Sequence, residues 1–266
     1  MRKLPNCEIP VVILCGGRGT RLPEHTEFIP KPLVEIGGMP ILWHIMKIYS
    51  HYGFKKFILC LGYKGNKIRE FFMNFEYLVN DFTLNLRSKE QKVFHETAKL
   101  EDWEITFVDT GQNTGTGGRL LKVEDYIKTP YFCMTYGDGL ANVNLNQIVD
   151  THFKMGKIVS LLGINPESQF GVIEIEDGLA KTFKEKPKLE GVINGGFFVF
   201  NKKIFDYLDG NSSILEKEPL KKLSIEKEIA VHYHSGFWKC LDTQKDVDLL
   251  NSMIYNSHPP WKIWKD

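Results

Sequence analysis

The sequence predicts an α/β fold in which helices flank a mostly parallel, mixed β-sheet. Through the first half of the chain, short apolar runs alternate with amphipathic stretches of helical period, which is the pattern of parallel strands joined by helices. After about residue 158 the apolar runs are shorter and follow one another closely. The 266 residues therefore fit a Rossmann-like sheet followed by a smaller β-rich part. We expect one domain over residues 1–266, with halves of about 9–157 and 158–266.

The elements of the first half follow from apolar periodicity. Val11–Cys15 is short, wholly apolar and followed by glycine, as expected of a buried strand. Ile41–Tyr52 places apolar side chains every three or four positions and stops at Gly53, which predicts a helix. The same criteria predict strands at Phe57–Leu61, Glu104–Asp109 and Tyr131–Tyr136, and helices at Ile68–Phe75 and near Leu120–Ile127. Residues 76–103 have no clean period and receive no assignment.

The second half is predicted to contain mainly strands and one C-terminal helix. The helix is capped by Asp242-Thr243 and carries Asp246 in its first turn. Beyond it, Trp261 and Trp264 are expected to dock on the domain or on a neighbouring subunit. The strands are expected at Ile158–Ile164, Val172–Ile175, Gly196–Phe200, Ile229–His234 and Phe237–Leu241, and the helix at Gln244–Ile254.

A glycine-rich, basic loop directly follows the first strand. Glycines let the backbone approach a ligand closely, and successive backbone N–H groups with an arginine favour anionic oxygens. A purely structural turn is the alternative. The spacing excludes a Walker A loop and the dinucleotide-binding G-x-G-x-x-G pattern. The strand end and loop comprise Leu14, Cys15, Gly16, Gly17, Arg18, Gly19, Thr20 and Arg21.

A lysine between two prolines lies ten residues beyond this loop. Lys31 is flanked by Pro30 and Pro32, and prolines on both sides are expected to hold its backbone extended. A lysine is a compact point charge suited to a phosphate group. The pairing of the glycine loop with Pro-Lys-Pro is more specific than either motif alone.

Two aspartates follow predicted strands. Asp138 lies between two glycines after Tyr131–Tyr136, and Asp242 follows Phe237–Leu241. Ligands gather at strand ends in open α/β sheets, and Mg²⁺ commonly takes one or two carboxylates together with phosphate oxygens. A turn residue at Asp138 and a helix cap at Asp242 are the structural alternatives. We expect the pair to hold Mg²⁺.

Residues suited to a sugar phosphate occur in the second half. Lys186, between Glu185 and Pro187, repeats the lysine–proline pattern, although such surface lysines are common. Asn194 and Gly195 supply an amide and an open backbone for sugar hydroxyls. A hairpin turn is the alternative there.

Composition excludes several classes of protein. The 34 basic and 33 acidic residues nearly balance, so the sequence predicts no strongly basic surface that would attract nucleic acid or an acidic membrane. No apolar run reaches the roughly 18 residues that a membrane span needs. The five cysteines form no Cys-x-x-Cys pair, and most lie in apolar runs. These features favour a reducing, cytoplasmic location.

The chain resembles the sugar-1-phosphate nucleotidylyltransferases, and among them most closely the glucose-1-phosphate cytidylyltransferases. The glycine loop with Pro-Lys-Pro marks the broad family, while Thr116-Gly117-Gly118-Arg119-Leu120 marks the cytidylyl branch. Residues 23–29 depart from the more polar family segment, which bears on loop closure and sugar choice. Further shared stretches are Pro32–Gly38, Ile41–Lys47, Gly62–Gly65, Val108–Gly111, Thr135–Gly139, Ile193–Phe198, Gly236–Trp238 and Pro260–Lys262.

This resemblance implies a Mg²⁺-dependent transfer of CMP from CTP to α-D-glucose 1-phosphate, giving CDP-glucose and pyrophosphate. It implies CTP contacts from Leu14 through Arg21 and at Thr114, Arg119 and Gly137, phosphate contact by Lys31, and metal binding by Asp138 and Asp242. It also implies a homo-oligomer, with a hexamer as one possible size. The alternatives are a uridylyl- or thymidylyltransferase and a non-catalytic homologue that binds sugar nucleotides.

The reaction needs little covalent chemistry from side chains. The sugar 1-phosphate brings its own anionic nucleophile, so catalysis reduces to in-line positioning and charge neutralisation at the α-phosphate. Arg21, Lys31 and Asp138 are the expected catalytic residues, while Lys186 holds the incoming sugar phosphate. The Arg119 guanidinium can only donate hydrogen bonds. Placed near N3 of the base, it favours cytosine, whose N3 accepts a hydrogen bond, over uracil, whose N3–H donates one. Capping or pairing near the following helix is its alternative role.

Overall fold

The computed structural model describes residues 3–88, 92–95, 100–168, 170–185, 187–188, 190–256 and 259–265. Short 3-10 turns occur at Asn6–Glu8, Lys31–Leu33, Glu124–Tyr126 and Lys202–Tyr207. The helices are α1 Pro23–Thr26, α2 Ile41–His51, α3 Gly65–Met73, α4 Phe75–Val79, α5 Thr116–Leu121, α6 Leu145–Met155, α7 Glu218–Ile225 and α8 Gln244–Tyr255. The strands are β1 Pro10–Leu14, β2 Glu35–Ile36, β3 Met39–Pro40, β4 Lys56–Leu61, β5 Phe82–Leu84, β6 Lys92–Phe94, β7 Glu104–Asp109, β8 Tyr131–Tyr136, β9 Gly139–Ala141, β10 Val159–Ile164, β11 Val172–Glu176, β12 Leu179–Lys184, β13 Ile193–Asn201, β14 Ile229–His234 and β15 Trp238–Cys240.

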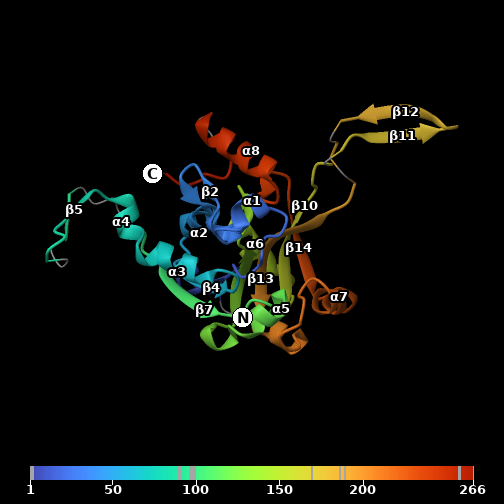
Figure 1. Cartoon of the computed structure of the whole chain (residues 1–266). Coiled ribbons are helices and arrows are strands. Elements are labelled where there is room, and N and C mark those ends of the chain that lie inside the picture. Colours follow the sequence, from blue (N-terminus) through green and yellow to red (C-terminus); the bar gives the residue numbers. More distant parts are fainter. Residues whose placement is uncertain are drawn as a thin grey trace.

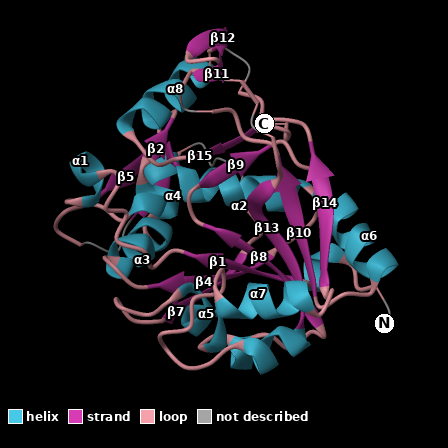
Figure 2. Cartoon of the chain, turned by 90° about the vertical axis from the view of Figure 1, so that its right-hand side faces the viewer, coloured by secondary structure: helices cyan, strands magenta, loops and turns pink. Residues whose placement is uncertain are grey.

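A seven-stranded sheet forms the centre of the molecule (Figures 1 and 2), in the order β14-β10-β13-β8-β1-β4-β7. Strands β8, β1, β4 and β7 are mutually parallel, and β10 is parallel to β14. Strand β13 runs antiparallel between β8 and β10. The predicted fold class, a mostly parallel mixed sheet flanked by helices, is therefore confirmed.

The central strands of the sheet are buried on both faces, as β1 shows. Val11 and Ile13 belong to an apolar cluster with α2, α3, α6 and α8, whereas Val12 and Leu14 belong to a second cluster with α5 and α7. Figure 2 shows these two helical layers on opposite sides of the strands. A strand covered on both faces needs apolar side chains at every position, which explains the unbroken run in the sequence.

The central sheet takes strands from both predicted halves of the chain. Strands β1, β4, β7 and β8 come from the first half, and β10, β13 and β14 from the second. The division into halves at about residue 157 stays a prediction. The continuous sheet nevertheless brings segments of the two halves to neighbouring positions.

Several predicted elements differ from the observed ones. The helix expected at Ile68–Phe75 begins earlier, at Gly65, and is interrupted at Asn74, after which α4 starts. Residues 76–103, unassigned from the sequence, include part of α4 and the small antiparallel pair β5–β6. The sequence did not predict helices α6 and α7, because each has only a short apolar stripe among many polar residues.

The helix predicted near Leu120–Ile127 is wrong in its position. Helix α5 starts at Thr116 and ends at Leu121, and a separate 3-10 turn follows at Glu124–Tyr126. Glycines have low helix propensity, so Gly117 and Gly118 give no local signal that a helix starts at Thr116. Tertiary packing overrides that propensity: a Cβ on Gly118 would lie 2.4 Å from the carbonyl oxygen of Asn211.

The C-terminal tryptophans dock on the same chain, which is one of the two predicted outcomes. Trp261 is fully buried, and Trp264 meets the ring of Trp43 edge-on at 5.9 Å. Between them lies His44 of α2, whose Nε2 donates to the carbonyl of Ile36 at 2.8 Å. Its Nδ1 then accepts from the Trp261 indole at 3.4 Å. This arrangement requires a neutral imidazole.

A two-stranded arm projects from the body of the molecule. Strands β11 and β12 form an antiparallel hairpin that extends away from the central sheet (Figure 1). Its apolar side chains are largely exposed, with Ile175 at 72% and Leu179 at 74% exposure. Within the described part of the chain, no helix combines the length and apolarity needed to cross a membrane.

We predict that His44 makes the protein less stable in acid. Burial lowers the pKa of His44 from 6.5 to about 4. In the unfolded chain His44 is protonated below about pH 6.5, whereas in the folded protein it stays neutral until about pH 4. The free energy of unfolding therefore decreases as the pH falls from 6.5 toward 4. By pH 5 the loss from this residue is about 2 kcal/mol. Urea unfolding between pH 8 and pH 5 measures it.

A His44→Phe variant tests the assignment to this residue. Its unfolding free energy should depend less on pH than that of the unsubstituted protein, whatever its absolute stability. The exposed His51 on the same helix provides the control, since His51→Gln should leave the dependence unchanged. An unaltered pH dependence in His44→Phe would contradict the prediction.

Candidate active site

A cleft of about 660 Å³ opens at the carboxyl ends of β1, β7 and β8. Parallel strands end at the same edge of a sheet, so the loops that follow them meet there. Every residue predicted to contact CTP lines this cleft, although the contact itself stays a prediction. These are Leu14, Cys15, Gly16, Gly17, Arg18, Gly19, Thr20, Arg21, Lys31, Thr114, Arg119 and Gly137.

Arg119 is buried beneath the glycine loop and joins three strand ends. Its guanidinium donates hydrogen bonds to oxygen atoms at the last residue of β4 and in the loops that follow β1 and β7. A buried carbonyl without a partner is costly, and this side chain supplies donors to the carbonyls of Gly111 and Gln112. It also adds a second donor to the carbonyls of Gly16 and Leu61, which already accept from backbone N–H groups. The acceptors are the carbonyls of Gly16 at 2.9 Å, Leu61 at 3.2 Å, Gly111 at 2.7 Å and Gln112 at 3.3 Å, and Thr110 Oγ1 at 2.7 Å.

This geometry gives Arg119 a role that the sequence did not predict. The predicted contact of Arg119 with the cytosine ring stays a prediction, but most of its donors are directed at the backbone. The loop comes so close that a Cβ on Gly16 would lie 2.0 Å from Arg119 Nη1. Glycine at position 16 is thus required by the guanidinium below the loop. Gly17 has open space around it, because a Cβ added there would have no atom within 4 Å beyond its chain neighbours.

Lys31 and two aspartates form an ion cluster at one end of the cleft. Lys31 Nζ lies 2.7 Å from Asp138 Oδ2 and 2.7 Å from Asp242 Oδ1. Arg21 Nη1 lies 2.7 Å from Asp242 Oδ2. Burial alone would lower the pKa of Lys31, but the charge and hydrogen bond of Asp138 and the hydrogen bond of Asp242 outweigh it and raise this pKa. Lys31 is therefore an ammonium ion.

The backbone of Lys31 differs from the prediction. Pro30 is extended, but Lys31–Leu33 forms a 3-10 turn in which the N–H of Val34 donates to the carbonyl of Lys31. Pro32 is tolerated because the N–H it lacks would have no partner within so short a turn. The turn directs the lysine side chain inward, and only 9% of that side chain is exposed.

The pairing of β9 with β15 brings the two aspartates together. Asp138 precedes β9, Asp242 follows β15, and Cys240 lies opposite Gly139 in the ladder. The structural alternative for Asp242 does not apply, since the N-cap of α8 is Thr243, which shares a capping box with Asp246. The Asp242 carboxylate is thus free of the helix and faces Lys31 and Arg21.

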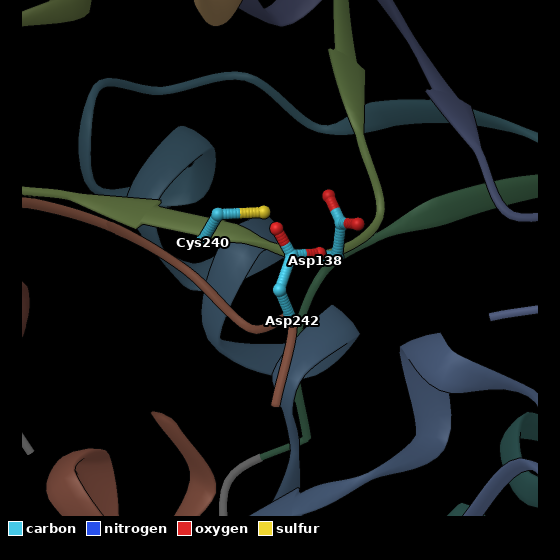
Figure 3. A group of neighbouring side chains, drawn as sticks. All are labelled: Asp138, Cys240 and Asp242. Carbon is cyan, nitrogen blue, oxygen red and sulfur yellow. The ribbon is translucent and has the colours of Figure 1, made fainter. Parts of the chain in front are cut away.

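These residues fit a divalent metal. Asp138, Asp242 and Cys240 offer ligand atoms within 4.8 Å of one another (Figure 3). The carboxylates already share a cation, the Lys31 ammonium, between them. Burial, with the neighbouring aspartates, raises the pKa of the Cys240 thiol, so it stays protonated. Two hard carboxylates suit Mg²⁺ better than a softer metal.

Of the residues predicted for the sugar phosphate, Asn194, Gly195 and Glu185 are not lining residues of the cleft. Asn194 and Gly195 lie in β13, beside β8, and the Trp238 indole donates to the carbonyl of Gly195 at 2.7 Å. The hairpin alternative for them is wrong, because the strand runs through both residues. Glu185 follows the projecting arm and is not a lining residue of the cleft. Lys186 lies outside the described residues.

Several cleft residues were not predicted. Gln112 and Asn113 follow β7, so the strand-end rule would have found them. Ser212 and Ile214 come from the connection between β13 and α7, which packs on the glycines of α5. No sequence signal marks these two, because only the fold brings them to the cleft. The remaining additional lining residues are Pro32, Gly115, Thr116, Tyr136 and Asp138, the last predicted as a metal ligand.

A family model described as nucleotidyl transferase matches residues 10–238. The chain belongs to this family. The match spans the glycine loop, Lys31 and Asp138, and it ends shortly before Asp242. The family resemblance inferred from the sequence is thereby confirmed.

Individual relatives of this nucleotidyl transferase cover nearly its whole length. It is 50% identical over 255 residues to a probable glucose-1-phosphate cytidylyltransferase of Bacillus subtilis (strain 168), covering 95% of this chain and 99% of that protein. It is 44% identical over 256 residues to the glucose-1-phosphate cytidylyltransferase of Salmonella typhi, with coverage of 96% and 99%. Among solved structures, HddC from Yersinia pseudotuberculosis complexed with GMP-PN has a TM-score of 0.67 at 20% identity, covering 92% of this chain and 99% of that one. That likeness supports the fold.

We predict that adjacent glycines of the loop differ sharply in tolerance. Gly16→Ala should lower the free energy of unfolding by about 1–3 kcal/mol, because the new methyl group displaces the Arg119 guanidinium from its acceptors. Gly17→Ala, the matched control, should change it by less than about 0.5 kcal/mol. Urea unfolding of the protein without nucleotide measures both. Equal losses would show that the guanidinium does not constrain the loop.

Proposed function

We propose that this nucleotidyl transferase moves CMP from CTP to α-D-glucose 1-phosphate, giving CDP-glucose and pyrophosphate, with Mg²⁺ as cofactor. The observation that carries the proposal is the convergence of the glycine loop, Arg21, Lys31 and Asp138 in one cleft, with Asp242 held beside it by ion pairs to Lys31 and Arg21. The choice of CTP and glucose 1-phosphate is supported by the relatives of Bacillus subtilis and Salmonella typhi, which carry that activity in their names.

The chemistry follows from charge and position. A phosphate oxygen of the sugar 1-phosphate attacks the α-phosphorus of CTP, a new P–O bond forms, and the bond to the β-phosphate oxygen breaks as pyrophosphate leaves. The attacking oxygen is already ionised, so no side chain has to remove a proton. Lys31 and Arg21 supply the positive charge that offsets the phosphate oxygens, and the glycine loop supplies backbone N–H groups.

The metal has a defined place in this proposal. Asp138 and Asp242 would hold it, and when bound it neutralises phosphate oxygens that the two carboxylates would otherwise repel. The side chains of the chain itself orient the substrates. Asn194 and Gly195 bind sugar hydroxyls, and Glu185 and Lys186 are proposed for the sugar phosphate.

We further propose that the protein is cytoplasmic. Its five cysteines are unpaired, as expected in a reducing compartment. Its proposed substrates are nucleotide and sugar phosphate, and neither nucleic acid nor a membrane is a proposed partner.

A nucleotide panel tests the function. With Mg²⁺ and glucose 1-phosphate, CTP should give the highest rate of pyrophosphate release, ahead of UTP and dTTP. Chelation of the metal should abolish turnover, as should Asp138→Asn, which removes one carboxylate while keeping the side-chain size. Glu35→Gln, an exposed carboxylate outside the cleft, is the control and should retain full activity. Equal rates with UTP or dTTP would favour the uridylyl or thymidylyl alternative, and no turnover with any nucleotide would favour a non-catalytic homologue.

We also propose that the chain forms a homo-oligomer through the β11–β12 arm. Its exposed apolar side chains include Ile173, Ile175, Leu179 and Phe183, and an exposed apolar cluster on a projecting hairpin is typical of a protein interface. A second copy is the proposed partner, and a hexamer is one size that the family resemblance implies.

The arm makes this assembly testable. Ile175→Glu combined with Leu179→Glu should lower the molar mass in light scattering after size-exclusion chromatography, because two charges would be buried in the interface. The control pair Met73→Glu and Ile225→Glu changes equally exposed apolar residues outside the arm and should leave the mass unchanged. A monomeric unsubstituted protein, or an unaltered mass for the arm variant, would contradict the proposal.

A further inference from the structure

The Lys31 ammonium occupies the point at which the two predicted metal ligands converge. Its Nζ is 2.7 Å from one oxygen of Asp138 and 2.7 Å from one oxygen of Asp242. A metal bound by the same oxygens would lie about 2.0–2.1 Å from each, which is the same space. The ammonium and a divalent ion therefore exclude each other there, by volume and by like charge.

The two cations that contact the carboxylates differ in how deeply they are held. Only 9% of the Lys31 side chain is exposed, whereas the Arg21 side chain is 70% exposed. Water and salt screen an exposed pair strongly and a buried pair weakly. Lys31 is therefore the main internal counterion of Asp138 and Asp242, and Arg21 adds a weaker contact.

Lys31 also lies next to the loop predicted to receive phosphate. The Cβ of its side chain lies 3.1 Å from the position of a Cβ on Gly19, so the lysine stem packs against the loop. Lys31, the glycine loop and Asp138 line one cleft. An ammonium on a flexible four-carbon stem can turn from carboxylate to phosphate oxygens without a backbone change.

We propose that Lys31 and the divalent metal are alternative occupants of the Asp138–Asp242 pair, exchanging when nucleotide phosphates draw the ammonium away. This inference rests on the proposed function, because it requires phosphate in the cleft. Without nucleotide, Lys31 holds the carboxylates together and keeps metal affinity low. With nucleotide, the freed carboxylates accept the metal, so nucleotide and metal strengthen each other's binding by the same factor.

The test measures Mn²⁺ binding to the full chain without nucleotide, by electron paramagnetic resonance of the free ion. Lys31→Met should bind Mn²⁺ at least about tenfold more tightly than the unsubstituted protein, equivalent to about 1.4 kcal/mol. Lys31→Arg keeps a cation beside the carboxylates and should retain weak binding. Lys122→Met removes a positive charge that contacts the Thr110 carbonyl instead, and should also retain weak binding. Adding Asp138→Asn to Lys31→Met should abolish the gain.

A second measurement reads the exchange in the unsubstituted protein and uses the conservative Lys31→Arg variant only to assign the resonance. In protein labelled with ¹⁵N-lysine, the hydrogen-bonded Lys31 ammonium should give a protected resonance, assigned by its loss in Lys31→Arg. Saturating Mg²⁺ should remove that protection. Unchanged protection at saturation, or Mn²⁺ affinity in Lys31→Met no higher than in the unsubstituted protein, would overturn the exchange. Failure of the proposed function would appear separately, as absent pyrophosphate release.

Discussion

The active-site cleft depends on one buried guanidinium. Arg119 binds the carbonyls that follow or end β1, β4 and β7, three neighbouring strands of the central sheet. Loops that leave parallel strands lie beyond the ladder, so few backbone bonds hold them to one another; the guanidinium adds to the N–H groups that the carbonyls of Gly16 and Leu61 already accept. With five N–H donors in a rigid fork, arginine can satisfy several such groups at once. The glycine loop is thus tied at Gly16 to the loop that follows β7.

A second constraint is charge balance at the other end of the cleft. Asp138 and Asp242 come from segments more than a hundred residues apart, and β9 pairs with β15 to bring them together. Two carboxylates this close repel each other unless a cation lies between them. The chain supplies that cation in Lys31, whose side-chain stem packs against Gly19. The side chain that balances these carboxylates is therefore also the one proposed to contact phosphate.

Much of the fold was readable in the sequence because the signals are local. A strand buried on both faces must be apolar throughout, so the run Val11–Cys15 predicts a strand, and the amphipathic period of Ile41–Tyr52 predicts a helix in the same way. The strand-end rule also pointed to Asp138 and Asp242, which the structure brings together through β9 and β15. Helix α5 was misplaced because its glycines serve a contact with residues 211–213 that no local pattern encodes.

By itself, the sequence determined the fold class, the family and the chemical types of the cleft residues, because strand periodicity and the glycine-loop and Pro-Lys-Pro motifs are local patterns. Only the tertiary structure decided what those residues contact. It directed Arg119 to backbone carbonyls, seated Lys31 between two carboxylates, freed Asp242 from the helix cap, and brought Ser212 and Ile214 to the cleft. Apart from the local Thr243–Asp246 cap, these contacts join segments distant in sequence, and their geometry is set by how strands pair and layers pack.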